Sequence, residues 1–318
     1  MKIGVIGCGR WGSCIAWYLD KLSNEVTLYG KSTSESMTEL MTTRKNKYMS
    51  LPDSLKLSTD ISKALENEIV VISIPSQQLS VLCNELNEYG IKDKTVVLCM
   101  KGIETSSCKR LSQIAKDILD KSNKIAVWLG PGHVEEFLNG IPNCMVIDSE
   151  DESVKRFLVD SFSSQLIRFY YGNDLIGNEI GAAAKNVIGI AAGMLDALNL
   201  STLKGALMSR GTREIARLIK AYGGNELSAY GLCHLGDYEA TVFSVYSSNR
   251  HFGESFIKGE KTEHLAEGYY TVKALVQMAE GCGVDLPICT AVYRILYENA
   301  PVKQQLEELF SRTIKKEF

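Results

Sequence analysis

Lys185 is the residue with the clearest chemical potential, because it is the only cation in the small-residue stretch 179–193. Gly181, Lys185, Gly189 and Gly193 recur every four residues, so they share one face of a predicted helix. Glycine costs a helix about 1 kcal/mol relative to alanine. The stripe therefore needs a compensating role, which is either close backbone packing or space cleared around Lys185.

The chemistry expected of such a lysine is proton transfer. A poorly hydrated lysine has a pKa lowered from about 10.4, and it can then exchange a proton with a substrate hydroxyl near neutral pH. The alternative is a structural lysine whose ammonium reaches solvent along its flexible stem.

A glycine-rich turn near the N-terminus predicts a dinucleotide site. The strand-like run KIGVI is followed by GCGRWG and then by a helix-like segment. In a turn of this kind Gly7 permits the tight bend, Gly9 lets a pyrophosphate approach the backbone, and Gly12 lets the helix pack close to the strand. The alternative is an ordinary glycine-rich turn between a strand and a helix.

The end of the second predicted strand bears on which dinucleotide is used. The acid expected about 20 residues beyond the glycine turn, which would hold the ribose hydroxyls, is missing. The strand ends instead in LYGK, which places Lys31 there. A lysine can pair with a 2′-phosphate, so we expect NADP, alone or beside NAD. The alternative is that Lys31 is simply solvated.

Short β-branched runs alternate with helical patterns through the first half of the chain. Strands are expected at residues 3–6, 25–29, 69–74, 95–100, 125–129, 144–147 and 166–170, with helices such as 76–88 and 105–119 between them. This alternation is typical of βαβ units and a parallel sheet. After about residue 172 only helical patterns remain, at 178–198, 202–221, 268–280 and 288–297. We therefore expect an α/β Rossmann-type doubly wound sheet in a dinucleotide-binding domain over 1–177. An all-α substrate-binding domain should follow over 178–318.

The loops that follow the strands should form the ligand-binding edge, because ligands of doubly wound sheets bind at the carboxyl ends of the strands. Four of the first five loops contain glycine, and two contain a lysine, Lys31 or Lys101. Bare backbone and positive charge suit a ligand that carries phosphate.

Composition excludes several classes of function. The net charge of −3 gives no support for a nucleic-acid partner. No uncharged apolar run reaches about 18 residues, so no membrane-spanning helix is expected, and no secretory signal is visible. The nine cysteines form no CxxC pair and the four histidines show no metal-ligand spacing. We expect reduced thiols, no metal site and a cytoplasmic protein.

An ordered set of motifs resembles the bacterial-type NAD(P)-dependent glycerol-3-phosphate dehydrogenase family over nearly the whole chain. The motifs are GCGRWG, LYGK, MKGIE, GPGHVEE, EIGAAAKNVIGIAAG, LGD at 235–237, SSNRHFG at 247–253 and AEG at 266–268. The resemblance implies reversible hydride transfer between dihydroxyacetone phosphate and sn-glycerol 3-phosphate, which supplies glycerophospholipid synthesis. It is also compatible with a homodimer.

The resemblance also implies residue roles. Lys185 looks like the catalytic proton donor and acceptor. The substrate-binding set it implies is Lys101, Gly130, Gly132, Lys185, Asp237, Ser247, Ser248 and Asn249. The cofactor-binding set is Gly7, Gly9, Arg10, Trp11, Gly12, Lys31, Lys101, Val134, Ser248 and Glu267. Asp237 retains the alternative of an ordinary surface turn.

Departures from the family pattern cluster in the substrate half of the site. Ser248 stands where the family usually has an arginine, and serine cannot replace its charge or its bidentate geometry. Arg250 is two residues further on and is a candidate for the same anion. Cys233 and His234 alter the stretch before Asp237. A different phosphorylated substrate, a β-hydroxyacid substrate and a non-catalytic dinucleotide sensor therefore stay open as alternatives.

Overall fold

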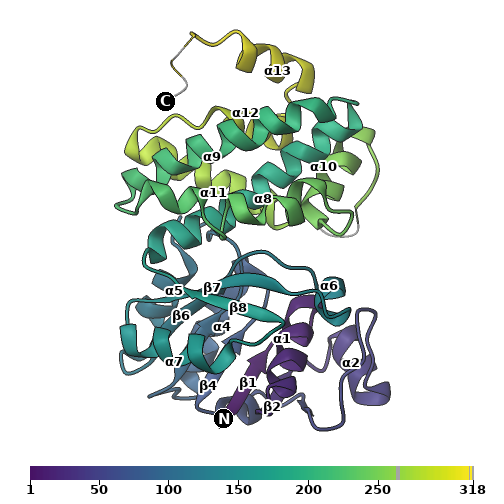
Figure 1. Cartoon of the computed structure of the whole chain (residues 1–318), viewed down its shortest axis with the longest axis vertical. Helices are drawn as coiled ribbons and strands as arrows, with labels where there is room; N and C mark the ends of the chain where they lie inside the picture. Colours follow the sequence, from purple (N-terminus) through teal and green to yellow (C-terminus); the bar gives the residue numbers. More distant parts are fainter. Residues whose placement is uncertain (263–265, 315, 317–318) are drawn as a thin grey trace. The chain divides into compact units, whose positions relative to one another are not determined.

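The computed structural model describes residues 1–262, 266–314 and 316, and it divides into two compact units (Figure 1). The first unit comprises Met1–Lys101 and Lys109–Glu179, and the second comprises Gly102–Cys108 and Ile180–Phe318. The units are defined by contacts within the chain, so the predicted boundary between a cofactor domain and a substrate domain stays a prediction.

The first unit is built on one eight-stranded sheet. Its strands are β1 (Lys2–Ile6), β2 (Glu25–Tyr29), β3 (Lys56–Ser58), β4 (Ile69–Ile72), β5 (Thr95–Leu98), β6 (Lys124–Leu129), β7 (Asn143–Ser149) and β8 (Ile167–Tyr171). The order is β3-β2-β1-β4-β5-β6-β7-β8. The central strands are buried along nearly their whole length, in keeping with their continuous Val, Ile and Leu runs.

The sheet is not wholly parallel, which corrects the sequence-based expectation. β7 pairs with β6 in the antiparallel direction, whereas every other neighbouring pair is parallel. The connection between them holds only α6 (Val134–Leu138). A five-residue helix spans about 7.5 Å, whereas the six residues of β6 span about 20 Å. The chain therefore does not return along the sheet, and β7 runs back beside β6.

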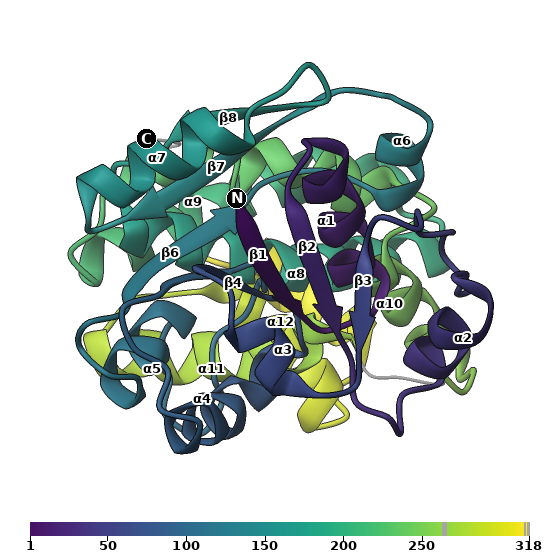
Figure 2. The ribbon, with the colours of Figure 1, turned by 90° about the horizontal axis from the view of Figure 1, so that it is seen from below.

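Helices cover both faces of this sheet (Figure 2). On one face lie α1 (Arg10–Lys21), α6 and α7 (Glu152–Phe162); on the other lie α3 (Ile61–Leu65), α4 (Leu79–Glu88) and α5 (Leu111–Ile118). The remaining elements are α2 (Glu35–Thr43) and the single turn η1 (Ser76–Gln78). Trp128 of β6 packs edge-on against Tyr18 of α1 and Phe169 of β8, with ring centroids 5.9 and 4.8 Å apart. This aromatic cluster joins α1 to the sheet, so it fixes the direction of the helix that follows the glycine turn.

In the second unit the described residues form helices and contain no strand. They are α8 (Leu175–Ala197, whose first turn belongs to the first unit), η2 (Ser201–Leu203), α9 (Lys204–Ala221), η3 (Glu226–Tyr230), η4 (Leu235–Asp237), the π-helix η5 (Glu239–Phe243), α10 (Ser248–Lys258), α11 (Glu267–Cys282), α12 (Pro287–Tyr297) and α13 (Val302–Phe310).

The predicted helix over 105–119 begins only at Leu111. Residues Gly102–Cys108 belong to the second unit, where they contact α11: the Thr105 hydroxyl donates to the Tyr270 carbonyl at 3.4 Å. This tertiary contact holds the segment outside a helix. Arg110 then caps α5 in a reciprocal arrangement with Gln113.

Among the described residues, α8 is the one helix that is long and apolar enough to cross a membrane, by length and composition alone. Its 23 residues have a mean hydropathy of 1.2 over the most apolar window, and 89% of that window is buried inside the structure. Such burial is typical of the core helix of a globular unit.

All nine cysteines are free thiols, as expected, and six of them are buried. Burial raises the pKa of Cys14 to about 12, so this thiol is protonated near neutral pH. Cys108 and Cys144 are partly exposed, and Cys282 is exposed.

Candidate functional site

The backbone of the glycine turn has the geometry that lets a ligand approach it closely. Gly7 has φ +110°, and a Cβ added there would lie 2.1 Å from the Ser73 carbonyl oxygen. A Cβ at Gly12 would lie 1.9 Å from the Gly7 carbonyl oxygen. At Gly9, by contrast, an added Cβ has no atom within 4 Å. Gly7 and Gly12 are therefore fixed by packing within the protein, whereas Gly9 presents open backbone at the start of α1.

The glycine turn is joined to the loop after β6. The Arg10 guanidinium pairs with the Glu135 carboxylate at 2.5 Å. Burial acts to raise the pKa of Glu135, but the bond and charge of Arg10, a backbone hydrogen bond and the charge of His133 together outweigh it, so the pKa lies below its ordinary value. Trp11 lies against Phe137, with ring centroids 6.2 Å apart. Val134 is 3% exposed and belongs to the core cluster, so its side chain is fixed in the protein interior.

Lys31 is exposed directly after β2. The preceding residue, Gly30, is buried, and a Cβ added there would lie 2.4 Å from the Cys8 sulfur. A carboxylate at position 30 is therefore excluded by packing. Lys31 is the first residue after this strand whose side chain reaches solvent.

Lys101 joins two neighbouring loops at the carboxyl edge of the sheet. Its ammonium donates to the Gly130 carbonyl at 2.5 Å. Gly130 has φ +122°, and Gly132 has φ +151° with the Phe137 ring 2.5 Å from an added Cβ. Because β5 and β6 are adjacent and parallel, these loops leave the sheet at the same edge. The first unit thus places one set of predicted residues at the carboxyl ends of its strands, either on loops or in the first turn of α1: Gly7 to Gly12, Lys31, Lys101, Gly130 and Gly132.

The second unit contains a buried cluster around Lys185. The Lys185 ammonium donates to the Thr241 hydroxyl at 2.8 Å and lies 3.2 Å from the Asp237 carboxylate. Lys185 is 9% exposed and Asp237 is 1% exposed. The surface-turn alternative for Asp237 is therefore wrong, because the carboxylate is buried against a cation. A buried charge requires this kind of compensation.

Thr241 is a site residue that sequence reasoning did not identify. It lies in the π-helix η5, 56 residues from Lys185, within an apolar run. A lone threonine in such a run carries no spacing signal. Only the fold brings its hydroxyl to the ammonium.

The glycine stripe on α8 is a packing surface. A Cβ at Gly181 would lie 3.0 Å from the His234 side chain, at Gly189 2.7 Å from the Thr241 methyl, and at Gly193 1.9 Å from the Arg250 carbonyl oxygen. The stripe therefore lets the segment 234–254 approach α8 closely. It brings Thr241 to Lys185 and does not leave space beside it, so the close-packing interpretation is the one the structure supports.

His234 holds the segment that carries Asp237. Its Nδ1 lies 2.8 Å from the Gly181 carbonyl oxygen, and its Nε2 lies 2.7 Å from the Tyr238 hydroxyl. Burial lowers the pKa of His234 to about 4, although the Gly181 carbonyl and Asp237 act to raise it. The ring is therefore neutral near pH 7. Because a carbonyl can only accept, Nδ1 carries the proton and Nε2 accepts from Tyr238.

The predicted phosphate-binding residues begin α10. Ser247 is the N-cap residue, and its hydroxyl accepts from the Arg250 amide at 3.3 Å. Ser248 is exposed in the first turn. Asn249 donates to the Asn186 side chain at 3.0 Å and accepts from the Gly268 amide at 2.9 Å. Asn249 thus ties α10 to α8 and α11, beside the predicted cofactor residue Glu267 at the start of α11.

Arg250, the candidate for the position of the missing family arginine, is paired within the protein. Its Nε pairs with Asp196 of α8 at 2.6 Å, and Lys204 pairs with the same carboxylate at 2.6 Å. Burial acts to raise the pKa of Asp196, but Lys204, Arg250 and Ser201 outweigh it and the pKa is lowered. Arg250 is therefore engaged in joining α8, α9 and α10.

Comparison with known proteins gives a consistent result along the chain. Residues 2–155 match the model for the NAD-dependent glycerol-3-phosphate dehydrogenase N-terminus, and residues 174–307 match the model for its C-terminus. The chain belongs to the NAD-dependent glycerol-3-phosphate dehydrogenase family.

Curated relatives and a solved structure agree with this assignment to the glycerol-3-phosphate dehydrogenase family. The chain is 35% identical to glycerol-3-phosphate dehydrogenase [NAD(P)+] of Thermoanaerobacter sp. (strain X514), over all of this chain and 99% of that one. It is 34% identical to the same enzyme of Chlorobium phaeobacteroides (strain BS1), with the same coverage. The crystal structure of glycerol-3-phosphate dehydrogenase from Coxiella burnetii superposes with a TM-score of 0.91 at 26% identity, covering 98% of this chain and 99% of that one.

Proposed function

We propose that this protein is an NAD(P)-dependent glycerol-3-phosphate dehydrogenase that interconverts dihydroxyacetone phosphate and sn-glycerol 3-phosphate for glycerophospholipid synthesis. Family membership over the whole chain supports this function. The observation that carries the chemistry is the buried cluster of Lys185, Asp237 and Thr241. We also propose a cytoplasmic location and a homodimer.

The first unit fits a dinucleotide. The open backbone at Gly9 lies at the N-terminus of a twelve-residue helix, where amide groups favour a pyrophosphate. Lys31 supplies a cation for a 2′-phosphate. Arg10 and Trp11 are the first residues of α1, directly after the turn. The nicotinamide, when bound, supplies or accepts the hydride.

Lys185 is proposed to hold and move the proton at the substrate oxygen. In the direction of reduction a hydride reaches the carbonyl carbon, negative charge grows on its oxygen, and the Lys185 ammonium stabilises that charge. The ammonium then gives the oxygen a proton, which leaves a neutral amine that is reprotonated from solvent. Oxidation runs the steps in reverse. Asp237 and Thr241 act by fixing the position of Nζ, since each lies within contact distance of it.

The substrate phosphate is proposed to bind at the N-terminus of α10. Ser247 is held there by a hydrogen bond from the Arg250 amide, and Asn249 by a hydrogen bond to the Asn186 side chain. Ser248 supplies a hydroxyl without a positive charge, so phosphate recognition at this position rests on neutral donors and the helix terminus.

The deciding experiment measures oxidation of NADPH and of NADH by the purified protein with dihydroxyacetone phosphate. Unphosphorylated dihydroxyacetone and a β-ketoacid serve as comparison substrates. We expect turnover with dihydroxyacetone phosphate. Turnover with only the β-ketoacid would favour the β-hydroxyacid dehydrogenase alternative, and no oxidation of either cofactor would contradict the proposal.

Lys185→Ala separates catalysis from cofactor binding. We expect turnover to fall by roughly 100-fold to 10,000-fold, because a positioned acid is removed, while NADPH affinity stays nearly unchanged. Lys220→Ala, an exposed substitution on α9, is the control. Equal losses of turnover and cofactor affinity in Lys185→Ala would indicate a structural lysine.

A further inference from the structure

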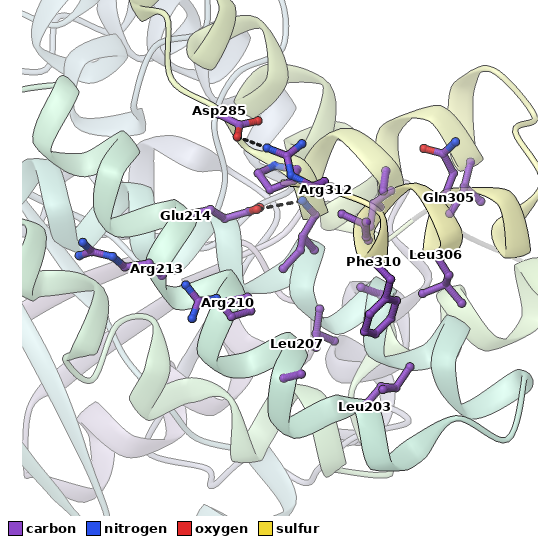
Figure 3. Close-up of a pocket in the computed structure, with 18 of the residues that line it drawn as sticks. Leu203, Leu207, Arg210, Arg213, Glu214, Asp285, Gln305, Leu306, Phe310 and Arg312 are labelled. Carbon is purple, nitrogen blue, oxygen red and sulfur yellow. Dashed lines mark hydrogen bonds and ion pairs between the residues drawn. The ribbon is translucent and has the colours of Figure 1, made fainter. Parts of the chain in front are cut away.

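A groove in the second unit is separate from every residue assigned above to catalysis or cofactor binding (Figure 3). Its volume is about 860 Å³, and it is lined by the C-terminal half of α8 and by α9, α12 and α13. Pockets of 300 to 1,000 Å³, roughly, with apolar walls and a few polar groups are typical of small-molecule sites.

One end of the groove is apolar. Leu203 of η2 and Leu207 of α9 face Leu306 and Phe310 of α13 across it (Figure 3). Met194 and Leu195 of α8 continue this wall. Phe310 is 71% exposed, so a large aromatic ring is held at the opening of the groove with little protein cover.

The other end is cationic. The charged residues of the lining are the cations Arg210, Arg213, Arg217, Arg312 and Lys316 and the acids Glu214 and Asp285. Five cations against two acids is a local excess of positive charge in a chain whose net charge is −3. Composition alone therefore does not account for it.

The two acids are engaged by the protein. Glu214 is 1% exposed and accepts from the Ile288 and Cys289 amides, each at 2.9 Å, which caps the start of α12. Asp285 pairs with Arg312 at the rim (Figure 3). Both acids therefore already have partners within the protein, and Arg210 and Arg213 contribute positive charge to the same lining.

The change from apolar to cationic follows the axis of α9. Leu207, Arg210, Arg213 or Glu214, and Arg217 recur at helical spacing, so they share one face of the helix. At about 1.5 Å per residue, the wall from Leu207 to Arg217 runs about 15 Å. The wall that α9 contributes to the groove therefore changes from apolar to cationic along its length.

We propose that this groove binds an amphipathic anion with a single hydrocarbon chain, whose carboxylate or phosphate head lies at Arg210 and Arg213. Arginine is suited to both head groups, since its guanidinium matches carboxylate and phosphate geometry. The chain lies between α9 and α13, against Leu207 and Phe310. Binding is a property of the helical unit and does not depend on the proposed catalytic function.

The test is titration calorimetry of the full chain with single-chain lipids below their critical micelle concentrations. Palmitate and lysophosphatidate represent the two possible sources of the anion, and monopalmitoylglycerol is the neutral comparison. We expect one equivalent of an anionic lipid to bind roughly tenfold or more tightly than the neutral one, and the preferred anion identifies the source. Equal binding of charged and neutral lipids, or no binding, overturns the proposal.

Two variants locate the site. Arg210→Ser combined with Arg213→Ser should weaken binding of the anion roughly tenfold or more, with Lys220→Ser on the same helix as the control. Phe310 is exposed, so Phe310→Ser should leave the core intact. This variant should weaken the binding of long-chain lipids and leave the binding of a short-chain anion unchanged. Unchanged binding in both variants overturns the proposed location. A dimer that Phe310→Ser dissociates in sedimentation, with no lipid binding in the native chain, would assign the groove to a second copy instead.

Discussion

Lys185 illustrates at the residue scale how a buried cation is tolerated. Removing an ammonium from water costs several kcal/mol, and the structure compensates with Asp237 and Thr241. Removal of one partner of a buried pair typically costs about 3 to 5 kcal/mol. The same contacts restrict Nζ to one position, which is what proton transfer to a single substrate oxygen requires.

Lys31 is expected to select between the two nicotinamide cofactors. A charge-assisted contact with a phosphate contributes roughly 1.5 to 3 kcal/mol, so Lys31→Ala should weaken NADPH binding roughly tenfold or more and NADH binding little. Fluorescence titration with both cofactors measures the ratio. Lys92→Ala, before β5 and so at the opposite edge of the sheet, is the control. An unchanged NADPH to NADH ratio would reject the role of Lys31.

Ser248 is expected to limit affinity for the phosphorylated substrate. Its side chain is exposed in the first turn of α10, so an arginine fits without displacing core residues. Ser248→Arg should lower KM for dihydroxyacetone phosphate roughly tenfold, because a guanidinium can bind phosphate bidentately. Ser248→Met, of similar length but neutral, should leave KM near the native value. If both variants change KM alike, Ser248 does not contact the phosphate.

Through the family resemblance the sequence assigned Lys185 and Asp237 to the substrate site, but it did not predict Thr241. Local patterns report periodicity and turn chemistry, whereas Thr241 reaches Lys185 only because Gly189 lets η5 pack against α8. The same limit applies to Arg250, whose pairing with Asp196 joins residues 54 apart.

At the element scale, burial explains which strands were predictable. β2 and β6 were predicted to within one residue because β-branched, aromatic and other apolar residues dominate both strands. β3 was missed because its three residues, Lys56–Ser58, carry no such run and are defined by pairing with β2. The direction of β7 was also missed, since it depends on the length of α6 and not on the strand itself.

The glycines of α8 are expected to be required for helix packing. Gly193→Ala places a Cβ 1.9 Å from the Arg250 carbonyl oxygen, and a backbone atom cannot give way cheaply. The free energy of unfolding should fall by roughly 2 kcal/mol or more. Gly205→Ala is the matched control, because nothing lies within 4 Å of its added Cβ.

The Gly205→Ala control should raise the free energy of unfolding by about 0.4 to 1 kcal/mol, since alanine has the higher helix propensity. Urea denaturation of both variants measures the contrast. Equal effects of Gly193→Ala and Gly205→Ala would mean that the stripe on α8 is not a packing surface.

At the scale of the whole molecule, two buried titratable groups of the helical unit, Glu214 and His234, have opposite effects on how stability depends on pH. Burial raises the pKa of Glu214 from 4.5 to about 7, and burial lowers the pKa of His234 from 6.5 to about 4. At about 1.4 kcal/mol per pH unit, each difference corresponds to about 3 kcal/mol. Between these values native Glu214 keeps a proton that the unfolded chain releases, and native His234 lacks a proton that the unfolded chain holds.

The two groups therefore change stability in opposite directions as pH rises. The contribution of Glu214 to the free energy of unfolding falls as pH rises from about 4.5 to 7. The contribution of His234 to the same quantity rises between about pH 4 and 6.5. Over their common range, one proton is bound and one is released on unfolding. We expect the pair to leave the free energy of unfolding nearly independent of pH there.

Glu214→Gln removes one of the two cancelling effects, so the effect of His234 on the free energy of unfolding should become measurable. The variant loses some stability at every pH, because the glutamine side chain offers one oxygen to the two α12 amides that the carboxylate satisfies. Its free energy of unfolding should also rise with pH between about 4.5 and 6.5, by roughly 2 to 3 kcal/mol relative to the native chain. Urea denaturation at four pH values measures this slope, with Glu280→Gln, at an exposed position of α11, as control. Parallel pH profiles for Glu214→Gln and the native chain would show that Glu214 does not retain its proton near neutral pH.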